Sequence, residues 1–201
     1  MELREIARLA APFVPRQVLL FSGHMVDAPD RKQPRFPADK LPQATQALQH
    51  ALDALGAGEG DLLLTQGAAG GDLLCAEACR ARGVRVQLLL PLEEPEFIER
   101  SVLPSADGEN WRARYYALKA ALLDAPRVMP DELGPLPKNA NAFARCNLWL
   151  LNTALAWGPD KVRFICLWDG GGGDGPGGTA DMYNEVKRRT GRVTWIDSRK
   201  L

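Results

Sequence analysis

The residues best suited to hold a ligand lie in two glycine-rich segments. Seven of the ten residues from Asp169 to Gly178 are glycine, and a second segment, GAAGGD, runs from Gly67 to Asp72. A glycine backbone can approach a phosphate group closely because no Cβ intrudes. Each segment precedes a helical pattern, and a helix N-terminus offers unpaired N–H groups and a partial positive charge. The two segments therefore predict a phosphate or sugar cradle, against the alternative that they are loose surface turns.

Several polar residues nearby are further candidates. Gly23 and His24 directly follow the apolar run QVLLFSG, where His24 is equally suited to act as a base, a phosphate contact or a cap. Asp72 begins a helical pattern, so a capping role comes first and a ribose contact second. Asn147 and Asn152 lie on an otherwise apolar helix face and need partners, so we expect one of them to face the site.

Some familiar chemistries are disfavoured by the residues present. The spacing of GAAGGD does not match G-x-G-x-x-G, and no P-loop lysine follows either segment, which argues against dehydrogenases and NTPases. The four cysteines show no zinc-binding pattern and are expected to be reduced, buried thiols: Cys75, Cys79, Cys146 and Cys166. We therefore expect no metal and no cofactor.

The elements that position these loops alternate between strands and helices along nearly the whole chain. This alternation predicts a Rossmann-like α/β fold, an open and mostly parallel sheet with helices on both faces. In such a sheet ligands bind beyond the carboxyl ends of the strands, so both glycine loops should converge there with Gly23. The segment DELGPLPKNAN is expected to be a proline-broken loop. Strands are expected at Gln17–Ser22, Asp61–Thr65, Val84–Leu90, Val162–Trp168 and Val193–Ile196.

The bulk composition sets the domain organisation and the expected partners. The chain has 201 residues, which we divide into an N-terminal helix or the end of an upstream region (1–16) and one binding domain (17–201). Acidic and basic residues balance at 25 each, which makes nucleic acid an unlikely partner. No apolar run approaches the ~18 residues of a spanning helix, and the first residues lack the features of a signal peptide. A cytoplasmic location away from membranes is expected.

The segment LLLTQGAAGGDLLCAEACRARGVRVQLLLP, together with the order helix, strand and PGGT between residues 142 and 186, resembles the SLOG superfamily. That group includes the LOG-type phosphoribohydrolases and the DprA/Smf proteins, and the resemblance covers roughly residues 17–197. It implies a Rossmann-like domain that binds nucleotides or nucleotide-derived signals. The LOG branch cleaves the N-glycosidic bond of nucleoside monophosphates. Other branches lie beside effector domains and sense NAD-derived messengers such as cyclic ADP-ribose isomers.

The resemblance also suggests roles for particular residues. Arg145 stands where LOG enzymes carry a helix arginine, and residues 176–179 match most of the P-G-G-x-G-T-x-x-E motif. Met182 stands where the motif glutamate belongs, and Glu185 follows three residues later. In an enzyme, Glu185 and Arg145 would be the catalytic pair, with Asp181 as the other carboxylate that could replace the motif glutamate. The ligand-binding residues are expected to be Gly23, His24, Gly67, Gly70, Gly71, Asp72, Arg145, Gly177, Gly178 and Thr179.

Two functions remain open from the sequence. The favoured one is a sensor module for a nucleotide-derived ligand of NAD or ADP-ribose type, or for another nucleotide, and the displaced glutamate supports it. The alternative is a LOG-like nucleotide N-glycosidase (phosphoribohydrolase). In such an enzyme Glu185 would have to reach the glycosidic bond from one helical turn away from the motif position. A DprA-like protein that binds single-stranded DNA is a weaker third reading. Further expected partners are a fused or associated effector domain and other copies of the same chain in a homo-oligomer.

Overall fold

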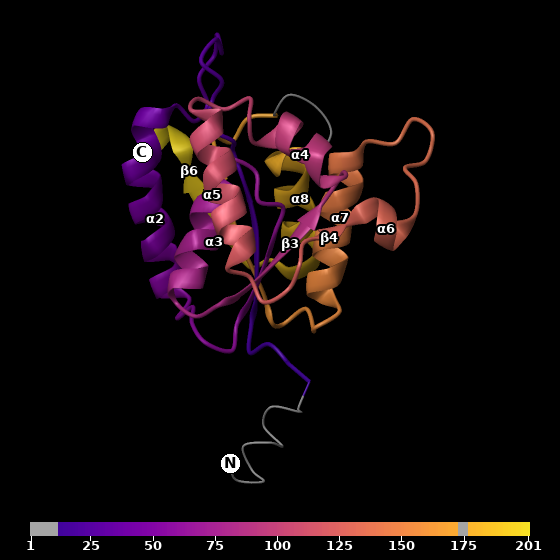
Figure 1. Cartoon of the computed structure of the whole chain (residues 1–201). Coiled ribbons are helices and arrows are strands. Elements are labelled where there is room, and N and C mark those ends of the chain that lie inside the picture. Colours follow the sequence, from indigo (N-terminus) through magenta and orange to yellow (C-terminus); the bar gives the residue numbers. More distant parts are fainter. Residues whose placement is uncertain (1–11, 173–176) are drawn as a thin grey trace.

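The computed structural model describes residues 12–172 and 177–201 and is built on a six-stranded parallel sheet (Figure 1). The strand order is β4-β3-β2-β1-β5-β6, and every neighbouring pair is parallel. All five predicted strands are confirmed to within one residue at each end. The strands are β1 (Val18–Gly23), β2 (Leu62–Thr65), β3 (Arg85–Leu90), β4 (Arg127–Val128), β5 (Val162–Trp168) and β6 (Val193–Asp197).

Helices cover both faces of the sheet, which explains why the central strands are apolar throughout. In β1, Leu19 and Phe21 pack on one face while Val18 and Leu20 pack on the other. The first face is covered by α2 (Leu41–Ala54), α3 (Gly71–Ala81), α4 (Glu94–Ser101) and α5 (Gly108–Ala120). The second is covered by α6 (Met129–Leu133), α7 (Ala142–Leu155) and α8 (Thr179–Thr190). The Rossmann-like α/β fold expected from the sequence is thus confirmed.

The strand order creates a crevice beside β1. From β1 the chain moves outward through β2, β3 and β4, then returns to place β5 on the opposite side of β1. The segments after β1 and β5 therefore leave the sheet in different directions, and Gly23 at the end of β1 pairs with Leu167 of β5. Such a reversal point is where open α/β sheets bind their ligands.

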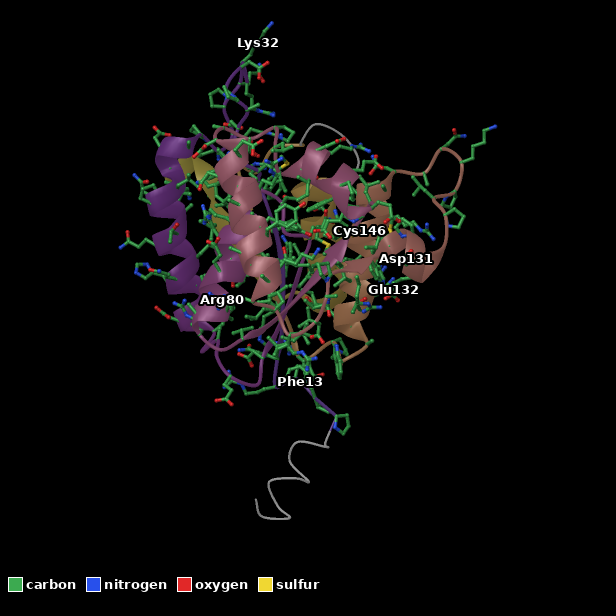
Figure 2. The ribbon with its side chains drawn as sticks, viewed as in Figure 1. Phe13, Lys32, Arg80, Asp131, Glu132 and Cys146 are labelled. Carbon is green, nitrogen blue, oxygen red and sulfur yellow. The ribbon has the colours of Figure 1, made fainter. Side chains whose placement is uncertain are left out.

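One predicted loop is partly helical. Residues 131–133, the first residues of the predicted loop DELGPLPKNAN, belong to the short helix α6 (Met129–Leu133), whose acidic residues Asp131 and Glu132 are labelled in Figure 2. Pro130 lies in the first turn, where its missing N–H costs nothing, and the two carboxylates favour the positive end of the helix. The two prolines of the predicted loop, Pro135 and Pro137, lie after this helix and are therefore compatible with it.

Two expectations concern residues outside the described part of the chain. The N-terminal helix was expected over residues 1–16, of which residues 1–11 are not described, and the second glycine segment lacks a description at 173–176. Within residues 12–172 and 177–201, no helix combines the length and the apolar character needed to cross a membrane.

Candidate functional site

A cavity of about 140 Å³ lies at the carboxyl end of β1, bounded by both glycine segments. The two segments thus converge on one edge of the sheet together with Gly23, as the sequence predicted. The cavity also receives residues from α7 and from the end of β2. Its lining residues are Ser22, Gly23, Met25, Gln66, Ala68, Asp72, Ser101, Phe143, Asn147, Gly177, Gly178 and Thr179.

Asp72 joins the ends of two strands beneath this cavity. Its Oδ1 accepts the Gly23 N–H at 3.2 Å, and its Oδ2 accepts those of Gly67 at 3.2 Å and Ala68 at 3.4 Å. The carboxylate therefore turns back to the loop before α3 and to β1, which is a different role from the expected helix cap. Burial raises the pKa of Asp72 to about 6, although the three N–H donors oppose this shift.

Gly70 and Gly71 meet the chain's own backbone. A Cβ on Gly70 would lie 2.7 Å from the Val26 nitrogen and 2.9 Å from the His24 carbonyl oxygen, and its φ is +102°. A Cβ on Gly71 would lie 3.2 Å from the Gly23 Cα, and the Gly71 N–H already donates to the His24 oxygen at 3.0 Å. These two glycines allow the segment after β1 to pass close to the start of α3. The Gly71 N–H already donates a hydrogen bond to that segment.

The second glycine segment is held by side chains of α7 and α8. Asn147 Nδ2 donates to the Gly177 oxygen at 2.8 Å, and the Gly177 N–H donates to Asp181 Oδ2 at 2.8 Å. Gln66 Nε2 in turn donates to Asn147 Oδ1 at 2.9 Å, which links the end of β2 to α7. Asn147 is therefore the asparagine of this helix that faces the cavity.

The end of β1 and the start of α8 are also linked directly. Ser22 Oγ donates to Thr179 Oγ1 at 3.3 Å, and Gly178 occupies the N-cap position of α8. A Cβ on Gly177, whose φ is +88°, would overlap the backbone nitrogen of Ala144. Gly177 therefore allows the loop to lie against the first turn of α7.

His24 lies at the same edge but outside the cavity lining. Its Nε2 accepts the Asp169 N–H at 3.1 Å, so the imidazole ties the end of β1 to the segment after β5. Burial lowers the pKa of His24, and a neutral ring suits this acceptor role. Burial works to raise the pKa of Asp169, but the Gly171 N–H and the neighbouring His24 outweigh it and lower that pKa.

Arg145 points away from the cavity. Its guanidinium donates to the carbonyl oxygens of Leu133 at 2.6 Å and of Gly134 and Pro135 at 3.1 Å. Leu133 ends α6, which lies beside α7 in Figure 1, and Gly134 and Pro135 follow it. Phe143 and Asn147 line the cavity, and a helical residue two positions from each faces about 200° away from them. The structure therefore does not bring Arg145 to the glycine segments.

The residue after Arg145 on α7 faces the sheet. Cys146, labelled in Figure 2, is fully buried and its Sγ lies 3.4 Å from the Leu89 oxygen of β3. Burial raises the pKa of its thiol above the ordinary value. The four cysteines are all buried and free, as expected.

Glu185 lies beside a second depression, a groove of about 300 Å³ between α7 and α8. The carboxylate pairs with Arg188 at 2.8 Å and with Arg189 at 3.2 Å, and its pKa is lowered, chiefly by the Arg188 hydrogen bond. Asn147 lines both the groove and the cavity. The groove is lined by Ala144, Asn147, Leu148, Asp181, Met182, Asn184 and Glu185.

Sequence reasoning missed several lining residues of the cavity. Gln66 directly follows β2, and a polar side chain just beyond the carboxyl end of a parallel strand could have indicated a site residue. Phe143 lies one helical turn before Asn147 and could have been found from it. Met25, Ala68 and Ser101 gave no signal of their own.

The fold and the cavity at its reversal point define a Rossmann-like α/β protein. No family model matches the chain, and no curated protein matches its sequence. Two solved structures of the Moco carrier protein from Chlamydomonas reinhardtii align over 92% of this chain and 91% of that chain, with 15% identity and TM-scores of 0.36 and 0.34. A likeness of this degree says nothing about which residues bind or what they bind.

Proposed function

We propose that this chain is a SLOG-type binding module for a nucleotide-derived ligand of NAD or ADP-ribose type, or for another nucleotide. The observation that carries the proposal is the cavity at the carboxyl end of β1, lined by residues of both glycine segments. Its position at the reversal point of the sheet is the usual ligand position of open α/β folds. Gly23, Asp72, Gly177, Gly178 and Thr179, all expected to bind, are among its lining residues.

The groove between α7 and α8 supports a ligand larger than the cavity alone. It shares the lining residue Asn147 with the cavity and has the apolar side chains of Ala144, Leu148 and Met182 among its walls. Small-molecule sites combine such apolar walls with a few placed polar groups. In our proposal the groove receives the base of the ligand, and Asn147 lies between the two parts.

The glycosidase alternative has less support from this geometry. Glu185 pairs with two arginines at the groove, and Arg145 donates to carbonyl oxygens beyond α7. General acid–base or electrostatic catalysis needs such groups within hydrogen-bond reach of the reacting atoms. Neither of the two residues lines the cavity at the reversal point. We therefore favour binding over turnover.

Calorimetry with ADP-ribose and with nucleoside monophosphates tests the proposal, alongside mass spectrometry of small molecules released when the purified protein is denatured. Asn147→Ala removes the amide shared by the cavity and the groove, and it should weaken binding by about tenfold or more. Gln46→Ala, an exposed glutamine on α2, is the matched control and should bind like the parent chain. Absence of binding by every compound of this panel would reject the proposed ligand class. Release of free base, abolished in Glu185→Gln, would restore the glycosidase.

A further inference from the structure

The polar side chains that line the cavity are mostly uncharged. Among the described residues of its lining there is no Lys or Arg, and the single ionisable side chain is that of Asp72. Phosphate sites in proteins ordinarily supply such a cation, since charge-assisted hydrogen bonds are the stronger ones. The remaining polar side chains are three hydroxyls and two primary amides, from Ser22, Ser101, Thr179, Gln66 and Asn147.

One carboxylate lines the cavity, and a second accepts a hydrogen bond from the lining residue Gly177; both oppose an anion. The carboxylate of Asp72 lines it directly. Asp181 lies in the first turn of α8, where its Oδ2 accepts the Gly177 N–H at 2.8 Å. Its negative charge therefore occupies the helix end that would otherwise attract a phosphate. A second anion there would meet a like charge and a donor already in use.

The amides offer both donors and acceptors to a ligand. Each primary amide has two N–H bonds and a carbonyl oxygen with two lone pairs. The described contacts use one N–H of Gln66, donated to Asn147, and one N–H of Asn147, donated to Gly177. The second N–H of each amide and the Gln66 carbonyl oxygen remain for a ligand. Hydroxyl groups both donate and accept, whereas an ionised phosphate mainly accepts.

The size of the cavity limits it to part of a nucleotide. Its volume of about 140 Å³ is below the ~300 Å³ at the lower end of ordinary small-molecule sites. A compact polar fragment fits this space, with the rest of the ligand in the groove beyond Asn147.

We infer that the cavity binds the vicinal hydroxyls of a ribose and does not recognise a phosphate. This inference rests on the proposed function and deepens it by assigning one part of the ligand to one set of residues. Recognition then depends on the amides of Gln66 and Asn147 and on the hydroxyls of Ser22 and Thr179. A ligand without the sugar hydroxyls gives no partner to the second N–H of each amide or to the Gln66 carbonyl oxygen, and such losses discriminate between analogues.

Calorimetry with adenosine, its 2′-deoxy and 3′-deoxy analogues, and AMP tests the inference. Adenosine and AMP should bind within about threefold of each other, while at least one deoxy analogue should bind about tenfold more weakly. Gln66→Ala should reduce that discrimination to less than about threefold, whereas Gln46→Ala should preserve it. The midpoint of urea unfolding checks that each variant is folded.

The outcomes separate this inference from the proposed function. AMP binding more than about tenfold tighter than adenosine, or deoxy analogues binding as well as adenosine, would overturn the inference and leave the nucleotide module standing. Retained discrimination in folded Gln66→Ala would overturn the residue assignment. Failure of all four compounds to bind would overturn the inference, and binding of ADP-ribose in the same measurement would still leave the nucleotide module standing.

Discussion

The first glycine segment contributes Ala68 and Asp72 to the cavity and the second contributes Gly177 and Gly178, yet the glycines of the two segments contact different parts of the protein. Gly70 and Gly71 lie against the backbone of residues 23–26. In the second segment, Gly177 lies against α7, while Gly172 has no atom near the position of a Cβ. In the first segment the glycines therefore allow the backbone to approach another part of the same chain, the residues that follow β1.

This difference changes what substitutions in the two segments report. A side chain in the first segment disturbs the junction between β1 and α3 and acts on stability before it acts on binding. At the end of the second segment, Gly178 and Thr179 line the cavity, so substitutions there act on ligand binding directly.

Gly70→Ala should destabilise the protein by about 3 kcal/mol or more, since it adds a backbone clash to a strained positive φ. Gly172→Ala is the matched control in the second segment. It should change the free energy of unfolding by less than about 0.5 kcal/mol, because nothing lies near the added methyl group. Urea unfolding of the three proteins measures both values. Equal stability of the two variants would remove the distinction between the segments.

Asp72→Asn should remove a pH dependence of stability. The pKa of Asp72 rises from 3.8 to about 6 on folding, so its contribution to stability is fully present below about pH 4 and is lost as the pH rises through 6. Two pKa units correspond to about 3 kcal/mol. The variant also replaces an acceptor by an amide facing N–H donors, which should cost about 1–3 kcal/mol at low pH.

Urea unfolding at a series of pH values gives the difference between the two proteins. That difference should shrink as the pH rises from about 4 to about 6, since only the parent loses stability in this window. A difference that is constant with pH would show that Asp72 does not titrate as described.

The fold could be predicted from the sequence because its signals are local. Each buried strand is a short apolar run, such as Val162–Trp168, and alternation with helical patterns gives a parallel sheet. The convergence of the two glycine segments followed from this topology alone. Their placement needed no knowledge of individual contacts.

The roles of individual site residues could not be predicted, because they depend on contacts between distant segments. Asp72 accepts from Gly23, 49 positions away, and Asn147 donates to Gly177, 30 positions away. Arg145 points to residues 133–135 because that loop returns to α7, which no local pattern indicates. The resemblance matched Arg145 to the helix arginine of LOG enzymes, but it did not give the partners of its guanidinium.

The smallest effect on binding is expected for Arg145→Ala. If Arg145 bound the ligand, as expected from the sequence, the loss of a phosphate contact would weaken binding by at least about tenfold. The structure predicts a change below about threefold, because the guanidinium donates to the carbonyl oxygens of Leu133, Gly134 and Pro135 and does not line the cavity. Its loss should instead cost about 1 kcal/mol of stability through these hydrogen bonds. Calorimetry with ADP-ribose and urea unfolding measure the two effects on the same variant. A tenfold loss of affinity in folded protein would return Arg145 to the site, while unchanged stability would contradict its described contacts.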